Sequence, residues 1–186
     1  MVRFFVRSCL ISFFVLLFLL SVASSNRVVK VKDICFWAEN PSFCSSLLNS
    51  KPGGADGADL VSLAQYSIDI VHANVTNTIN LINSLIAHST TDPKARDHYI
   101  MCLSRFGYEG ALGDVEHTQR MLRSGNYFGM SVGANDITGH IDGCIREGSQ
   151  SGPPYHDMSL LPKYGSVVEQ VAQIILMISN FLMNSN

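Results

Sequence analysis

The chain has 186 residues, of which 47% are hydrophobic and 15% are charged. This length is enough for one domain with its own core, and the composition is too apolar for a chain that stays disordered. The formal net charge is −2, and Lys and Arg form no cluster, which excludes a basic surface for nucleic acid.

Residues 1–25 have the pattern of a secretory signal peptide. Arg3 and Arg7 precede an apolar run, Leu10–Leu20, and small residues occupy positions −1 and −3 of a cleavage site after Ser25. A transmembrane anchor is the alternative, but the segment contains both arginines and lacks a basic stop on its far side. We therefore expect residues 26–186 to be exported without a membrane partner. Cleavage removes two of the 13 basic residues, so the mature net charge becomes −4.

The mature chain is predicted to be all-α, because its long segments repeat apolar residues every three or four positions and show no strand alternation. Residues 28–50 predict two short helices that are separated at Asn40–Pro41. Residues 51–57 contain Pro and three Gly and predict a linker. The clearest helix then begins near Asp59, which suits a cap or a first-turn acid.

The next helix is predicted to begin at Asp92–Pro93 and to continue to about Leu122, with Ser124-Gly125-Asn126 ending it. It contains a row of three glycines, each of which costs about 1 kcal/mol relative to Ala inside a helix. Such a row should have a structural use, either the close approach of a neighbouring backbone or a kink. The glycines are Gly107, Gly110 and Gly113.

A third helix is predicted over residues 127–146, and a last one follows a loop with Gly and Pro over residues 148–165. Four long amphipathic helices with short links predict an antiparallel four-helix bundle over residues 58–183, extended by the helical hairpin of residues 28–50. The residues expected in its core are Leu60, Ala64, Ile68, Val71, Val75, Ile79, Ile82, Leu112, Val115, Ile137, Ile141, Val171, Ile174 and Ile178.

Four cysteines remain after the signal peptide, which carries Cys9, is removed. An even number in an exported chain indicates disulfides, and four cysteines allow three pairings. Cys35 and Cys44 are close in sequence and the other two are distant, so the economical pairing is Cys35–Cys44 with Cys102–Cys144.

Zinc is the competing interpretation of the same cysteines. His98 and His140 each precede a cysteine by four residues, so each pair would share one helix face. An exporting compartment oxidises thiols that lie so close together, which argues against the metal site. We therefore expect no metal, and we expect the two histidines to be ordinary surface residues.

No catalytic motif is found in the sequence, and neither is a phosphate-binding or dinucleotide-binding turn. The expected protein is not an enzyme and needs no cofactor. One potential N-glycosylation acceptor occurs, at Asn74-Val75-Thr76.

Several segments resemble the plant pectin methylesterase inhibitor and invertase inhibitor family. The segment Cys35–Cys44 is similar to the Cys-x8-Cys opening of this family, including Asn40-Pro41. The similarity continues through residues 51–54, 58–60, 64–70, 91–93 and 124–127, both cysteine-containing helices and residues 178–182. It covers nearly all of residues 30–183, and the order and spacing of the segments are what make it specific.

The resemblance implies a disulfide-braced four-helix bundle with an N-terminal helical hairpin, exported to the cell wall, apoplast or vacuole. It implies stoichiometric inhibition of a carbohydrate-active enzyme. Residues 64–70 and the ending Ile178-Ser179-Asn180 are closer to the pectin methylesterase inhibitors, so this esterase is the expected partner. Acid invertase is the alternative, and a bundle that binds an apolar ligand or serves a structural role is a third hypothesis.

In the esterase inhibitors, helices of the bundle present acidic and polar side chains to the pectin-binding cleft of the enzyme. The resemblance therefore implies that the outer face of the second and third bundle helices binds the partner. The acidic candidates on these helices are Glu109, Asp114 and Glu116.

Overall fold

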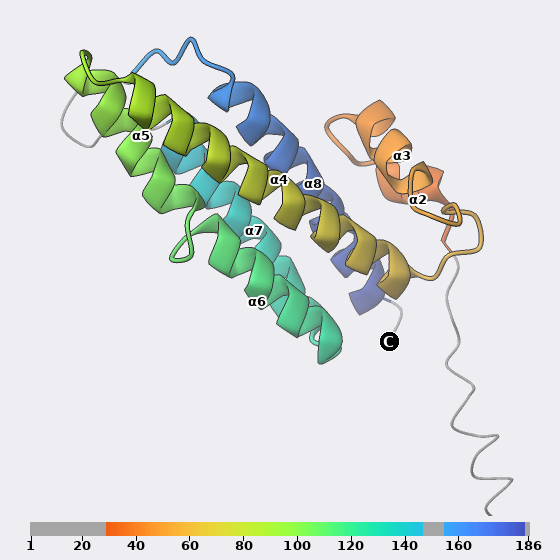
Figure 1. Ribbon diagram of the computed structural model, residues 1–186. Coiled ribbons are helices and arrows are strands. Elements are labelled where there is room, and N and C mark those ends of the chain that lie inside the picture. Colours follow the sequence, from red (N-terminus) through yellow and green to blue (C-terminus); the bar gives the residue numbers. More distant parts are fainter. Residues whose placement is uncertain (1–28, 147–154, 185–186) are drawn as a thin grey trace, which may run out of the picture.

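The computed structural model describes residues 29–146 and 155–184, and the predicted signal peptide lies outside these ranges. The described residues form seven helices and no strand (Figure 1). They are α2 (Val31–Cys35), α3 (Pro41–Asn49), α4 (Leu60–His88), α5 (Pro93–Phe106), α6 (Ala111–Arg123), α7 (Tyr127–Ile145) and α8 (Leu161–Met183).

The long helices form the predicted antiparallel bundle. α5 and α6 follow one another along one side of α4, and α7 and α8 complete the bundle (Figure 1). α8 packs on both α4 and α7, and α7 packs on α6 and α5. By length and composition α8 could cross a membrane, but its apolar positions, including Val168, Ile175 and Ile178, are buried inside the bundle.

Local capping explains where the helices begin. Asp59 accepts a hydrogen bond from the backbone N–H of Ser62 at 2.8 Å, which confirms its expected role. Asp92 accepts one from Ala95 at 3.1 Å, and Pro93 occupies the first turn, where its missing N–H costs nothing. Two asparagines cap α3 and α7 in the same way: Asn40 accepts from Phe43, and Asn126 accepts from Gly129.

The core consists of the apolar stripes that the helical spacing predicted. All of the expected core residues are buried except Ile79 and Leu112, which are partly buried at its margin. Helix periodicity therefore identified the inward face of each bundle helix, because an amphipathic helix has only one apolar side to bury.

The predicted continuous helix from Pro93 to Leu122 is wrong, because the chain breaks between α5 and α6. Gly107–Gly110 forms a turn in which the N–H of Gly110 donates to the carbonyl of Gly107 at 3.0 Å. A Cβ at Gly110 would lie 2.1 Å from the backbone oxygen of Arg105, and a Cβ at Gly113 would lie 2.1 Å from that of Tyr108. The row of glycines thus permits a sharp break in the chain. Of the two uses that the sequence suggested, the break corresponds to the kink, but it ends α5 completely.

The last helix also begins earlier than predicted. α8 begins at Leu161, inside the segment that was expected to be a loop up to Gly165. Ser159 accepts a hydrogen bond from the backbone N–H of Leu161 at 3.0 Å, and Pro162 suits the first turn. Gly165 lies within the helix, and the side chains of Ile141 and Ile145 pack closely against the position where a Cβ would lie.

Two disulfides brace the fold, in the pairing that the spacing favoured. Cys35–Cys44 closes the hairpin of α2 and α3, and Cys102–Cys144 ties α5 to α7. The hairpin lies beside α8 (Figure 1). The amide of Asn40 donates to Gln170 of α8 at 3.0 Å, so the first described helices are held by the last one.

Candidate functional site

The three acidic candidates come from α6 and the turn before it, but they do not point to one place. Glu109 lies in the turn between α5 and α6 and is exposed, next to the exposed ring of Tyr108. Its carboxylate is therefore free to meet a partner. Of the three candidates, it is the one whose position agrees best with a recognition role.

Asp114 points toward α7 instead of toward solvent. Its carboxylate lies 3.2 Å from Nε2 of His140, and each side chain is about three-quarters buried, with 25% and 26% exposed. Burial raises the pKa of the Asp114 carboxyl, and nearby Asp136 adds to this, whereas His140 and His117 oppose it. Asp114 therefore joins α6 to α7, and His140 is not the ordinary surface residue that the sequence suggested.

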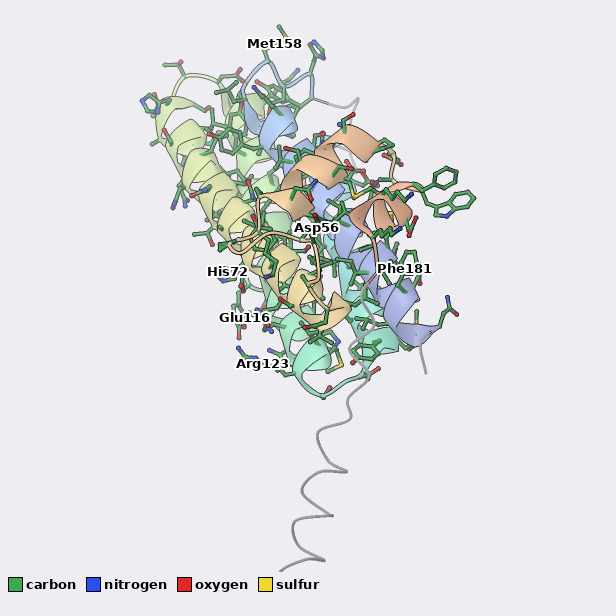
Figure 2. All side chains as sticks on the ribbon, turned by 90° about the vertical axis from the view of Figure 1, so that its right-hand side faces the viewer. Asp56, His72, Glu116, Arg123, Met158 and Phe181 are labelled. Carbon is green, nitrogen blue, oxygen red and sulfur yellow. A yellow bond between two sulfur atoms is a disulfide. The ribbon has the colours of Figure 1, made fainter. Side chains whose placement is uncertain are left out.

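Glu116 faces the other side of α6. Residues two apart on an α-helix are separated by about 200°, so Glu116 and Asp114 cannot share a face. Glu116 lies 4.0 Å from Arg120 and borders a groove of about 400 Å³ between α4 and α6. Figure 2 shows it on the same side of the molecule as His72 and Arg123. The groove is lined by Ile68, Asp69, His72, Val115, Glu116, Gln119, Arg120 and Arg123.

A pair of amides crosses between α4 and α6 beside this groove. Gln65 and Gln119 each donate to and accept from the other at 2.7 Å, and Gln65 also contacts Asp69 at 2.7 Å. The groove therefore has a fixed polar wall, with one carboxylate on each helix and two guanidinium groups on α6. Its mixed charges give no preference for a ligand of one sign.

Three glycines of α7 lie under side chains of α5 and α6. Positions for a Cβ at Gly129 and Gly133 are filled by Met121 and Thr118 of α6, at 2.6 and 2.3 Å. At Gly143 the guanidinium of Arg105 lies 3.1 Å from the corresponding position. These contacts hold α5, α6 and α7 closely together, so their outer surface is rigid.

The exposed residues of α7 form a stripe that we call the α7 face: Phe128, Val132, Asn135, Asp136 and Gly139. Phe128 is 69% exposed, which is unusual for a large apolar side chain. Sequence reasoning did not single out these residues. The helical spacing nevertheless indicates their exposure, because they alternate with the inward positions of α7. Those inward positions are Met130, Ala134, Ile137 and Ile141, all of which are buried.

His98 is buried, so the expectation that it lies on the surface is wrong. Only 5% of the residue is exposed, because the chain segment before α8 covers it. The sulfur atoms of Cys102 and Cys144 are bonded to each other, so they do not supply the thiolates that the alternative zinc site requires.

The predicted glycosylation acceptor, Asn74, lies half-buried on α4. Its side-chain amide donates to the carbonyl of Ile70 at 2.8 Å, and the residue lines a shallow groove between α3, α4 and α8. A glycan attached to this amide would have to pass along the groove to reach solvent. Glycosylation at Asn74 stays a prediction.

The comparisons with known proteins assign the family. The model of the plant invertase/pectin methylesterase inhibitor family matches residues 29–178. The chain belongs to this family. A pectinesterase inhibitor from Actinidia deliciosa is 33% identical over 165 residues, which are 89% of this chain and 84% of that protein. Pectinesterase inhibitor 1 from Arabidopsis thaliana is 31% identical over 132 residues, which cover 70% and 72% of the two chains.

Solved structures of this family have the same fold. A crystal structure of a pectin methylesterase inhibitor from Arabidopsis thaliana matches with a TM-score of 0.60 and 26% identity, and covers 87% of this chain and 98% of that one. A mutant form of a pectin methylesterase inhibitor from Arabidopsis matches with a TM-score of 0.67 and 27% identity, over 79% and 93%. The family resemblance and the disulfide-braced helical bundle are thereby confirmed.

Proposed function

We propose that the mature chain is an exported inhibitor of pectin methylesterase, which binds the enzyme one to one and covers its pectin-binding cleft. The observation that carries this proposal is the similarity to a pectinesterase inhibitor over most of both chains. The bundle is braced by the Cys102–Cys144 disulfide and by close helix contacts. A rigid surface of this kind suits stoichiometric binding, because little conformational freedom is lost on association.

The test uses residues 26–186 with both disulfides formed. Methanol release from esterified pectin is measured for a panel of pectin methylesterases at increasing inhibitor concentration, and calorimetry gives the stoichiometry. We expect activity to fall to a plateau at one inhibitor per enzyme. The same titration against acid invertase tests the second activity in the family's description. Inhibition of invertase with full activity of every esterase would replace our proposal by that alternative.

The partner surface that we propose is the outer side of α5, α6 and α7. It includes the exposed turn with Glu109 and the α7 face, on which Phe128 and Val132 offer apolar contact area. Aromatic residues are enriched at protein interfaces, and a rigid ring costs little entropy when it is buried. Asp114 supports this surface from behind, because it joins α6 to α7.

Single substitutions separate the acidic candidates from one another. Glu109→Ala should weaken inhibition most, whereas Asp114→Asn and Glu116→Ala should have smaller effects, because their side chains contact His140 and Arg120. Glu39→Ala is the matched control, since Glu39 is exposed on the hairpin, away from this surface. Equal inhibition by all four variants would place the interface on another face of the bundle.

Export and charge provide two further tests. Amino-terminal sequencing of the secreted protein should find Asn26 as the first residue.

The mature chain has a net charge of −4, which suits a cleft with basic residues, so added salt should weaken binding mainly by slowing association. An affinity that is independent of salt would exclude a role for these exposed charges.

A further inference from the structure

The segment before α8 is fastened to α5 through one carboxylate. We call residues 155–160 the strap; Figure 2 shows Met158 at the end of the bundle where the strap lies. Oδ1 of Asp157 accepts a hydrogen bond from the hydroxyl of Tyr99 at 3.0 Å and one from the backbone N–H of Ser159 at 2.8 Å. The strap is thus anchored on α5 just before α8 begins.

His98 lies between the strap and a disulfide. Its ring packs against the ring of Tyr155 with centroids 4.8 Å apart, and its Nε2 lies 3.6 Å from Oδ2 of Asp157. The side chains of His98 and Asp157 are only 4% and 6% exposed. The same Nε2 lies 3.7 Å from the sulfur of Cys102. The order from solvent inward is therefore strap, His98 and disulfide.

The protonation of the His98 ring follows from these neighbours. Burial lowers the pKa of His98, although the charge and the hydrogen bond of Asp157 oppose this effect. Nε2 faces a carboxylate oxygen and a sulfur atom, both acceptors, so the neutral ring carries its proton on Nε2. Among the described residues, Nδ1 of His98 has no hydrogen-bond partner.

The disulfide beneath His98 is closed to reagents in this arrangement. Both Cys102 and Cys144 have 0% of their surface exposed. A thiolate must reach one sulfur atom directly to exchange with a disulfide. We propose that opening of the strap controls the reduction of Cys102–Cys144 by small dithiols, and that His98 makes Cys102 the sulfur that leaves first. The inference concerns this bond and is independent of which enzyme the chain inhibits.

The exchange has two balanced steps. A thiolate of the dithiol attacks Sγ of Cys144, a new sulfur–sulfur bond forms, and the Cys102–Cys144 bond breaks with its electron pair on Sγ of Cys102. That thiolate forms beside the Nε2–H of His98, which stabilises it by donating a hydrogen bond, and solvent then supplies its proton. The second thiolate of the dithiol displaces Cys144 and yields the cyclic oxidised dithiol. The protein gains two electrons and two protons, and the covalent tie between α5 and α7 is lost.

The experiment follows each disulfide separately during reduction by dithiothreitol. Samples are quenched with an alkylating reagent and the labelled cysteines are assigned by mass spectrometry. Asp157→Ala removes the carboxylate that fastens the strap, so Cys102–Cys144 should be reduced about tenfold faster or more, since hydrogen bonds to a charged group limit local opening. His156→Ala is the matched control, because His156 is an exposed residue of the same segment.

The Cys35–Cys44 bond is the reference inside each molecule, because it lies in the hairpin and not beneath the strap. Its rate should be the same in all variants. Tyr99→Phe keeps the ring and loses only the hydroxyl bonded to Asp157, so it should show a smaller acceleration in a protein that folds. With glutathione as the probe, the first mixed disulfide should form at Cys144. Unchanged rates, equal acceleration of both disulfides, or an adduct at Cys102 would each overturn the proposal.

Discussion

Asp114 of α6 and His140 of α7 meet across the interface of these two helices, with 3.2 Å between a carboxylate oxygen of Asp114 and Nε2 of His140. The pair is three-quarters buried, and burial raises the pKa of the Asp114 carboxyl despite the histidine. At neutral pH the folded state therefore carries a carboxylate that its surroundings disfavour. The contact fixes geometry more than it adds stability.

Replacement of Asp114 by Asn should consequently leave the free energy of unfolding within about 1 kcal/mol of the wild type at pH 7. A raised pKa in the folded state means that the folded protein binds the proton more tightly. As pH falls toward the pKa of folded Asp114, the wild type should gain stability relative to the variant. Urea unfolding at several pH values measures this difference. A loss of several kcal/mol at pH 7 would instead indicate a strongly coupled buried pair.

Two glycine substitutions should have opposite effects. Gly113→Ala places a Cβ 2.1 Å from the backbone oxygen of Tyr108, so the turn between α5 and α6 must shift and the protein should lose about 1–3 kcal/mol. Gly139 lies inside α7 with nothing within 4 Å of its Cβ position. Gly139→Ala should therefore stabilise the protein by about 0.5–1 kcal/mol. Thermal unfolding of both variants tests the pair. Destabilisation by Gly139→Ala would refute our description of α7.

The two disulfides should contribute unequally to stability. Cys102–Cys144 spans 42 residues and Cys35–Cys44 spans nine. In the chain-entropy model, loss of the first costs about 4 kcal/mol and loss of the second about 2.5 kcal/mol. Double Ala variants of each pair, compared by denaturant unfolding, give these values. The reverse order would show that native-state contacts of the hairpin outweigh the entropy of the unfolded chain.

The buried His98 should make the fold sensitive to mild acid. Its pKa in the folded state is below the ordinary 6.5 because burial disfavours the charged ring. The unfolded state therefore binds the proton more readily, and stability should fall as pH decreases from about 6.5 toward the folded-state pKa. The slope from this one group is at most about 1.4 kcal/mol per pH unit. His98→Gln should show a flatter decline between pH 7.5 and 5 in urea titrations. If the free energy of unfolding declined equally with pH in the wild type and in His98→Gln, the acid sensitivity would not come from His98.

The bundle was predictable from the sequence because its determinants are local. Helical spacing marks the buried stripe of α4, and Asp59 and Asp92 mark the starts of helices through hydrogen bonds to residues three positions later. The burial of His98 was not predictable, since it depends on Tyr155 and Asp157, more than fifty residues away. Nothing in the local pattern of α5 distinguishes a histidine under such a segment from one in solvent.

The candidate site was predicted less well than the fold. Sequence spacing shows that Asp114 and Glu116 lie on opposite sides of a helix, but the neighbour on each side depends on how α6 is rotated against α4 and α7. The break at Gly107–Gly110 separates α6 from α5, so the residue spacing along α5 does not fix that rotation. Glu109 was identified as a candidate only through the family resemblance. The exposed ring of Phe128 was missed, although the helical spacing places it outside the inward stripe of α7.

The hairpin of α2 and α3 rests on α8, and the amide of Asn40 reaches Gln170 across 130 residues of chain. During synthesis the hairpin leaves the ribosome before the bundle helices, and α8, which receives it, is made last. Its disulfide can close early, because Cys35 and Cys44 are near neighbours, but its docking must wait for the complete chain. A polypeptide that stops before α8 would therefore carry a closed hairpin with nowhere to bind. A cell's quality control can recognise unfinished molecules by hairpin residues such as Ile34 and Leu48, which the finished fold buries completely.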